Sequence, residues 1–194
     1  MKTAIILTGL NRSKLNYYLN HKEIIDKYNA DVYISTYNTP KENGYLSIQE
    51  MLDLYTPIKI DIEEYSRIEP QFQKLVDNIQ WRDYQIKNQF RFVPKPINVC
   101  SMWYKIQKGF DIIDNEYDVY IRMRFDNTFD KVIIEENNFL NFPLQSGHSG
   151  ICDQFAFGNY NNMKEYCHTY DKLEDYIKSG GEFHSETIVK NLNE

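Results

Sequence analysis

The segment YDVYIRMRFDN, residues 117–127, carries the side chains whose types and spacing are best suited to chemistry. Apolar residues alternate with Arg122 and Arg124, so a strand here would place both guanidinium groups on one face. An arginine fork binds phosphate oxygens through two parallel hydrogen bonds. Asp126, at the strand end, offers a carboxylate that can hold a divalent metal beside a diphosphate leaving group. The alternative is that the arginines pair with neighbouring acids and that Asp126 caps a turn.

Two further candidates lie in the last quarter of the chain. Asp153 opens the sequence DQFAFG and is a candidate general base, or an anchor for an acceptor hydroxyl. Its alternative role is that of a polar residue at the start of a strand. His184, in GGEFHSET, is a candidate metal ligand, with an ordinary solvent-exposed loop histidine as the alternative. The other histidines have weaker claims: His21, His148 and His168.

Several common catalytic signatures do not occur in the sequence. It contains no G-x-G-x-x-G, no G-x-x-x-x-G-K-[ST], no H-E-x-x-H and no G-x-S-x-G. Dinucleotide oxidoreductases, P-loop NTPases, zincins and serine hydrolases of the α/β type are therefore disfavoured.

The elements that would position these residues begin with a βαβ unit. Residues 3–8 (TAIILT) form an apolar run that predicts a strand buried on both faces. Ser13 is the expected cap of a helix over about 14–28, and residues 31–37 predict a second strand. Strand, helix and strand in this order predict a parallel sheet covered by helices. Ligands bind at the carboxyl ends of such strands, which here carry the following residues: Thr8, Gly9, Arg12, Tyr37, Arg122 and Arg124.

The remaining pattern continues this α/β arrangement. Strands are predicted at about 57–62, 117–126 and 150–158. Helices are predicted at about 47–54, 68–92 (with Trp81, Tyr84, Ile86 and Phe90 as anchors), 99–115, 160–178 and 184–193. With no internal repeat and no long linker, residues 1–194 are expected to form a single α/β domain with a mostly parallel sheet flanked by helices.

Composition narrows the class of protein further. The chain has 194 residues, 42% of them hydrophobic, and a formal net charge of −6, which disfavours a nucleic-acid-binding role. No apolar run approaches the roughly 20 residues of a membrane helix, and the apolar start is too short for a signal peptide. The three cysteines form no C-x-x-C pair, which argues against a disulfide framework. We therefore expect a soluble, cytoplasmic protein without an integral membrane segment.

In its order of motifs the chain resembles small glycosyltransferases of the GT-A type, which act in bacterial and viral polysaccharide or glycan synthesis. Four stretches carry the likeness: TAIILTGLNRS, ADVYISTYN, SMWYKIQKGFDIIDNEYDVYIRMRFDN, and ICDQFAFGNYNNMKEY followed by EFHSET. Together they span nearly the whole chain. The resemblance implies a Rossmann-related sheet, with a nucleotide-binding part at about 1–127 and an acceptor-side part at about 128–194.

The resemblance also implies a reaction, partners and roles for residues. A hexosyl group would pass from a UDP- or GDP-sugar donor to a hydroxyl of a glycan acceptor. Thr8, Gly9 and Arg12 would approach the nucleotide, and Tyr37 would stack on the base. RMRFD stands where the family has its metal-binding D-x-D, but Arg124 replaces the first acid, so the Mn²⁺ or Mg²⁺ cofactor would depend on Asp126, with His184 as a second ligand. Asp153 would be the base of an inverting displacement, or would orient substrate in a retaining one.

Two other functions remain open at this point. A sugar nucleotidyltransferase shares the nucleotide-binding plan, but the Gly-rich opening loop expected of it is missing. A non-catalytic module that binds nucleotide or glycan would fit the incomplete D-x-D. The sequence leaves open the donor, the acceptor, the stereochemical outcome and the oligomeric state.

Overall fold

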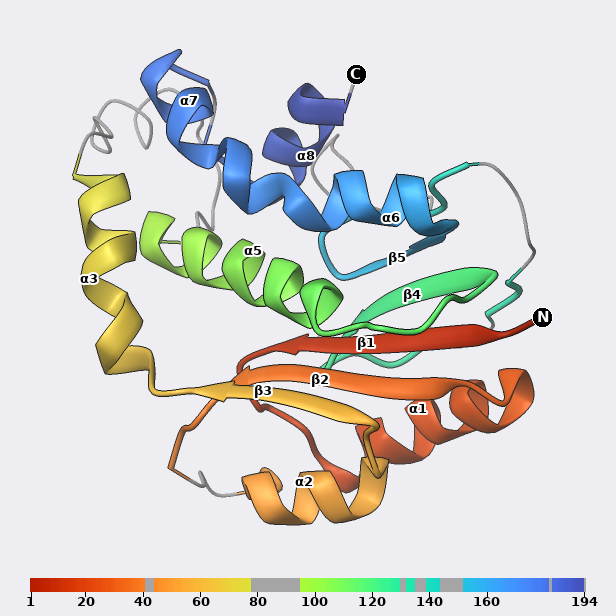
Figure 1. Ribbon diagram of the computed structural model, residues 1–194. Helices are drawn as coiled ribbons and strands as arrows, with labels where there is room; N and C mark the ends of the chain where they lie inside the picture. Colours follow the sequence, from red (N-terminus) through yellow and green to blue (C-terminus); the bar gives the residue numbers. More distant parts are fainter. Residues whose placement is uncertain are drawn as a thin grey trace.

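A computed structural model gives an α/β fold built on one five-stranded sheet (Figure 1). It describes residues 1–40, 44–77, 95–129, 132–134, 139–143, 152–181 and 183–193. The strand order is β3-β2-β1-β4-β5. The strands are β1 (Thr3–Gly9), β2 (Asp31–Tyr37), β3 (Lys59–Glu63), β4 (Val119–Arg124) and β5 (Phe155–Gly158). The helices are α1 (Leu15–Tyr28), α2 (Ile48–Tyr55), α3 (Tyr65–Val76), α5 (Pro96–Asp111), α6 (Tyr160–Cys167), α7 (Leu173–Lys178) and α8 (Ser185–Asn193).

The central strands form the expected parallel core. β1 pairs in parallel with β2 and with β4, and β2 pairs in parallel with β3. Every residue from Thr3 to Thr8 is buried, because helices cover both faces of the sheet. β5 differs, since it pairs with β4 in the antiparallel sense. The expectation of a mostly parallel sheet flanked by helices is confirmed.

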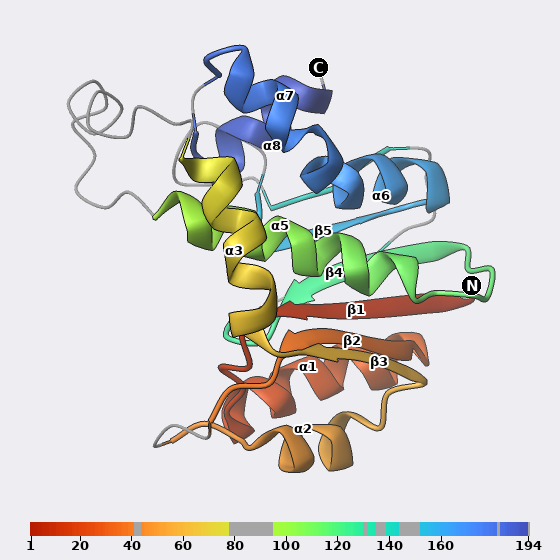
Figure 2. The same cartoon turned by 60° about the vertical axis from the view of Figure 1, so that its left-hand side comes forward.

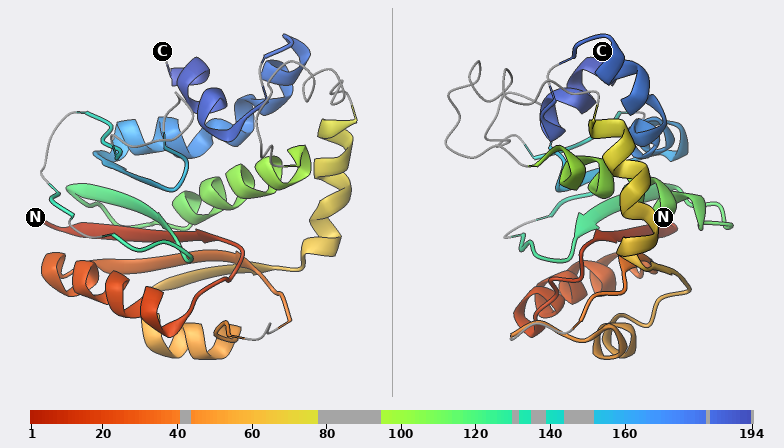
Figure 3. Two further views of the ribbon diagram at one scale, coloured as in Figure 1. Left: turned by 180° about the vertical axis from the view of Figure 1, so that it is seen from behind. Right: turned by 90° about the vertical axis from the view of Figure 1, so that its left-hand side faces the viewer.

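Helices lie on both faces of the sheet, as the views from behind and from the side show (Figures 2 and 3). α1 and α2 cover one face, where Ile24 and Met51 join the apolar cluster formed with Ile5 and Leu7. On the other face α5 runs across β1 and β2, and α6, α7 and α8 pack beyond it. α5 approaches β1 so closely that a Cβ at Gly109 would lie 2.7 Å from the Cγ2 atom of Thr8.

Several helices begin or break at residues other than those expected from the sequence. Lys14, and not Ser13, is the N-cap residue of α1, and the Ser13 hydroxyl instead lies 3.4 Å from the hydroxyl of Tyr55. The helix expected over 99–115 is α5, which begins earlier because Pro96 suits the first helical turn. The helix expected over 160–178 is interrupted by a 3₁₀ segment, His168–Lys172.

Parts of two predicted elements lie outside the described residues. The first is residues 78–92 of the predicted helix over 68–92, with its proposed anchors Trp81, Tyr84, Ile86 and Phe90. The second is the first two residues of the strand predicted over 150–158. His148 also lies outside the described residues. In the described part of the chain, none of the helices is both long and apolar enough to cross a membrane.

Candidate functional site

A cavity of about 750 Å³ lies at the edge of the sheet where the parallel strands β1, β2 and β4 end. β5 runs the opposite way, so the residues that precede it reach the same edge. All nine residues proposed from the sequence line this cavity: Thr8, Gly9, Arg12, Tyr37, Arg122, Arg124, Asp126, Asp153 and His184. The nine residues therefore gather at one edge of the sheet, the edge at which the parallel strands end.

Arg122 is the most enclosed charged group in the cavity wall. Its side chain is 0% exposed, its Nε donates to the Thr8 hydroxyl (3.2 Å), and its Nη1 donates to the backbone carbonyl of Asp153. Its other terminal nitrogen, Nη2, is buried and makes no hydrogen bond within the described residues. A buried guanidinium nitrogen without an acceptor is costly, so this geometry favours an anionic ligand here.

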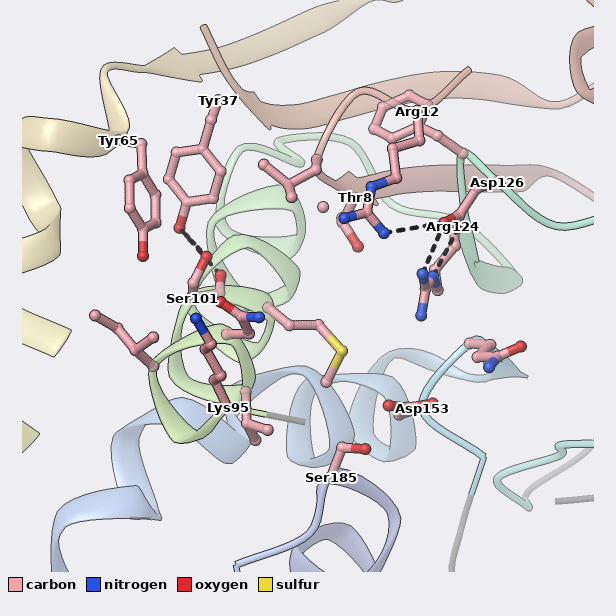
Figure 4. A pocket seen from close by; sticks show the side chains of 18 of the residues that line it. Thr8, Arg12, Tyr37, Tyr65, Lys95, Ser101, Arg124, Asp126, Asp153 and Ser185 are labelled. Carbon is pink, nitrogen blue, oxygen red and sulfur yellow. Dashed lines mark hydrogen bonds and ion pairs between the residues drawn. The ribbon is translucent and has the colours of Figure 1, made fainter. Parts of the chain in front are cut away.

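Arg124 and Asp126 form a two-pronged ion pair at the end of β4 (Figure 4). Nε and Nη2 of Arg124 donate to the two carboxylate oxygens of Asp126, both at 2.8 Å. Arg12 lies 3.8 Å from the same carboxylate. Burial acts to raise the pKa of Asp126, but the hydrogen bonds and positive charge of Arg124 outweigh it and hold the pKa below its usual range. The alternative role, in which neighbouring acids pair with the arginines, thus holds for Arg124, whereas Arg122 pairs with no acidic side chain among the described residues.

The residues present do not fit the expected divalent metal. Both oxygens of Asp126 already accept from Arg124, and the positively charged Arg12 lies nearby. Divalent hard cations take several oxygen ligands, usually with at least one free carboxylate. Nowhere in the described ranges do three His, Cys, Asp or Glu side chains gather in a way that could hold a metal ion. No step that we propose for this site uses a metal.

Asp153 and His184 also line the cavity, and the backbone carbonyl of Asp153 accepts the hydrogen bond from Arg122 Nη1. The Asp153 side chain is mostly buried, and its carboxylate makes no hydrogen bond to another described residue, so it can accept one from a substrate hydroxyl. Ser185 begins α8 on the same side (Figure 4). His184 is only 6% exposed, so the alternative role of a solvent-exposed loop histidine was wrong.

Tyr37 lines the aromatic end of the cavity, but its surroundings do not suit base stacking. The ring is 1% exposed, Lys105 Nζ lies 4.7 Å from its centroid, and its hydroxyl donates to the Ser101 carbonyl (3.1 Å). Tyr65 meets it edge to face, with the ring centroids 5.2 Å apart, and is itself more exposed (Figure 4). Tyr65 is therefore the better platform for a planar ligand.

Thr8 and Gly9 shape the cavity through the backbone. Thr8 is buried and accepts from Arg122, so it orients the guanidinium. Gly9 has φ +111°, a conformation that favours glycine, and its carbonyl accepts from the Thr36 hydroxyl at 2.7 Å. These two residues fix the course of the chain between β1 and Arg12.

Sequence reasoning missed the contribution of α5. Its first turns line the cavity through Asn98, Ser101 and Met102, and Lys95, which occupies the N-cap position, lines it as well. The partial positive charge of a helix N-terminus favours anions nearby. The signal was present in Lys95-Pro96, because proline is favoured at the first helical position and so marks a helix start.

Comparisons with known proteins add no relative. Neither a scan of protein-family models nor a search of curated proteins finds a match for this chain. The residues of the cavity are therefore the basis on which a function can be assigned.

Proposed function

We propose that this protein is a glycosyltransferase of the GT-A type that moves a sugar from a nucleotide-sugar donor to a hydroxyl of a glycan acceptor. The observation that carries the proposal is the buried Arg122, which lines the same cavity as Asp153. Within the described residues the Nη2 atom of Arg122 has no hydrogen-bond partner, and the carboxylate of Asp153 makes no hydrogen bond. The guanidinium of Arg122 suits a diphosphate, and the carboxylate of Asp153 suits an attacking hydroxyl. The donor and the acceptor of a sugar transfer need these two groups near each other.

The arginine end would bind the diphosphate of the donor. Arg12, Arg122 and Arg124 line this end, and the N-terminus of α5 adds a favourable dipole. Negative charge builds on the departing diphosphate as the glycosidic bond breaks, and fixed guanidinium groups stabilise that charge without reorganisation. Tyr65, at the other end, supplies a surface for the base.

Asp153 would act on the acceptor. Its carboxylate accepts the proton of the attacking hydroxyl in an inverting displacement, while the diphosphate leaves toward the arginines. In a retaining transfer the same carboxylate would orient the substrate. The anomeric configuration of the product, read by NMR, separates these two courses.

The first experiment measures thermal unfolding of the full chain with UDP, GDP, CMP and their common sugar conjugates. A ligand at about 100 times its Kd adds about 2.7 kcal/mol to stability, a clear rise in Tm. A selective rise with one nucleotide sugar supports the proposal and identifies the donor. No rise with any of these ligands contradicts it.

A variant then tests the role of Asp153. We expect D153N to lower transfer at least about a hundredfold, the scale of a lost general base, with little change in donor Kd. The matched control is D175N, on the exposed surface of α7, which should transfer normally. Full activity in D153N would contradict the assignment.

A binding module without catalysis is the second candidate, because the Arg124–Asp126 pair leaves no free carboxylate at the position of the metal-binding D-x-D in the family that the chain resembles. Such a module would give the same rise in Tm but neither transfer nor donor hydrolysis. Release of pyrophosphate from a nucleoside triphosphate and a sugar phosphate would instead identify a nucleotidyltransferase.

A further inference from the structure

We infer that the diphosphate subsite works without a divalent metal, and that Asp126 is a positioning residue for Arg124 and not a metal ligand. The inference rests on the proposed function, because it concerns how the same cavity holds the donor. It assigns the work of neutralising the diphosphate to three guanidinium groups: Arg12, Arg122 and Arg124.

The first support is that both carboxylate oxygens of Asp126 already accept hydrogen bonds from Arg124. Its two oxygens each accept one hydrogen bond of 2.8 Å from the planar fork of Arg124. Such a pair fixes the guanidinium plane, and the carboxylate orients the arginine toward the cavity that both residues line. Arg12, at 3.8 Å, approaches the same carboxylate from the segment after β1. A cation at Asp126 would compete with Arg124 for the carboxylate oxygens and would be repelled by the charges of Arg124 and Arg12.

The second support is independent of Asp126 and comes from Arg122. The group is 0% exposed, and its Nη2 has no partner in the described part of the chain, while its other nitrogens are held by Thr8 and by the Asp153 carbonyl. This arginine is fixed in place with one nitrogen, Nη2, left without a partner in the described residues. A phosphate oxygen that reached Nη2 would satisfy it.

The charges at this end agree with a diphosphate. Arg12, Arg122 and Arg124 set against the carboxylates of Asp126 and Asp153, which is close enough to act on Arg124, give 3 − 2 = +1. A nucleotide sugar carries one negative charge on each of its two phosphates. The arginine end is therefore positively charged without a metal ion and attracts such a ligand.

The test measures binding of UDP and GDP to the full chain by calorimetry, first in EDTA and then with Mn²⁺ or Mg²⁺. We expect binding in EDTA, with a Kd that either metal changes by less than about threefold. Electron paramagnetic resonance of Mn²⁺ alone should show no site that depends on Asp126. The Tm of each variant is recorded to confirm that it is folded.

Variants separate the two possible roles of Asp126. D126N leaves Arg124 without its charged partner, and we expect the Kd in EDTA to weaken about tenfold, the scale of a lost charge-assisted contact. D126E, which keeps the carboxylate, should recover part of that loss, and R124K should weaken binding because lysine lacks the planar fork. D26N is the matched control, since it removes the carboxylate of an exposed ion pair with Lys22 on α1, outside the cavity.

The outcomes distinguish this inference from the function on which it rests. Binding that requires Mn²⁺ or Mg²⁺, with D126N abolishing only the metal effect, overturns the inference and leaves the proposed function standing. Absence of nucleotide binding with and without metal overturns both. Metal-independent binding that D126N and R124K weaken, and that D26N does not, supports the inference.

Discussion

At the residue scale, His21 of α1 makes hydrogen bonds to two other parts of the chain, α2 and the segment that follows β4. Its Nδ1 lies 2.8 Å from the Tyr55 hydroxyl on α2, and its Nε2 lies 2.8 Å from the backbone carbonyl of Asn127, the residue after Asp126. Because Nε2 faces a carbonyl, it carries the proton, and Nδ1 accepts from Tyr55. Burial lowers the pKa of this imidazole to about 4.

The lowered pKa of His21 predicts a loss of stability in weak acid. The unfolded chain takes up the proton near pH 6.5 and the folded chain only near pH 4, so stability is complete above 6.5 and declines as the pH falls toward 4. Between pH 7 and pH 5 we expect a loss of about 2 kcal/mol. Urea unfolding at the two pH values measures it. H21Q, which cannot titrate, should lose less, and an equal loss in H21Q would contradict this origin.

Residue types at strand ends could be predicted from the sequence, but their pairing could not. The apolar runs of β1, β2 and β4 fix which residues follow each strand, and a parallel sheet brings these residues to one edge. Arg124, and not Arg122, pairs with Asp126. The guanidinium of Arg122 instead donates to the backbone carbonyl of Asp153, in the segment that precedes β5. Periodicity carries no information on that contact.

At the element scale, an ion cluster of one buried lysine and two partly exposed carboxylates connects α5 to the edge strand β3. Lys105, 0% exposed, donates to Asp61 (2.7 Å) and to Glu63 (2.5 Å), and its ammonium lies over the ring of Tyr37. We expect K105M to destabilise the fold by about 3 kcal/mol, because it leaves two carboxylates without their cation. Urea unfolding measures this. The control is K59M, which breaks the exposed pair with Asp114 and should change stability by less than about 1 kcal/mol. An equal loss of stability in K105M and K59M would contradict the stabilising role of the ion cluster around Lys105.

The contact of α5 with β1 gives a second prediction at this scale. A Cβ at Gly109 would lie 2.7 Å from Thr8 Cγ2 and 2.8 Å from Ile6 Cγ2, so G109A should push the helix away from the strand. We expect a loss of about 1–3 kcal/mol, the usual cost of overpacking, and weaker nucleotide binding because Thr8 orients Arg122. S66T, which adds a methyl group on the exposed face of α3, should be nearly neutral in both measurements. An unchanged Tm in G109A would show that α5 can move freely.

Local sequence patterns predicted the positions of the helices and strands better than they predicted strand direction or helix type. Helix and strand positions followed from hydrophobic spacing, but the antiparallel direction of β5 did not, since a four-residue strand carries no signal for the direction in which it pairs. That direction decides that Asp153 lies at the arginine end. The 3₁₀ segment between α6 and α7 also escaped prediction, because the residues on both sides continue the helical pattern.

At the scale of the whole molecule, the proposed nucleotide and acceptor parts share one hydrophobic core. Ala4 and Tyr33, from β1 and β2, belong to the same buried cluster as Tyr166, Leu173 and Ile188 from α6, α7 and α8. Trp103 of α5 lies inside this cluster, with its ring centroid 5.3 Å from that of Tyr166. Separating residues 1–127 from the rest would therefore expose a large apolar surface.

This shared core predicts that the chain unfolds as a single cooperative unit. Urea curves followed by tryptophan fluorescence and by far-ultraviolet circular dichroism should coincide, because Trp103 reports on the same cluster that the helices and the sheet build. A fragment of residues 1–127 should not fold alone, since its face around α5 loses the packing of α6 and α8. Two separate transitions, or a folded fragment, would show that the two parts are independent. Coincident curves would instead mean that ligand binding at the arginine end stabilises the acceptor side as well, because neither part can unfold without the other.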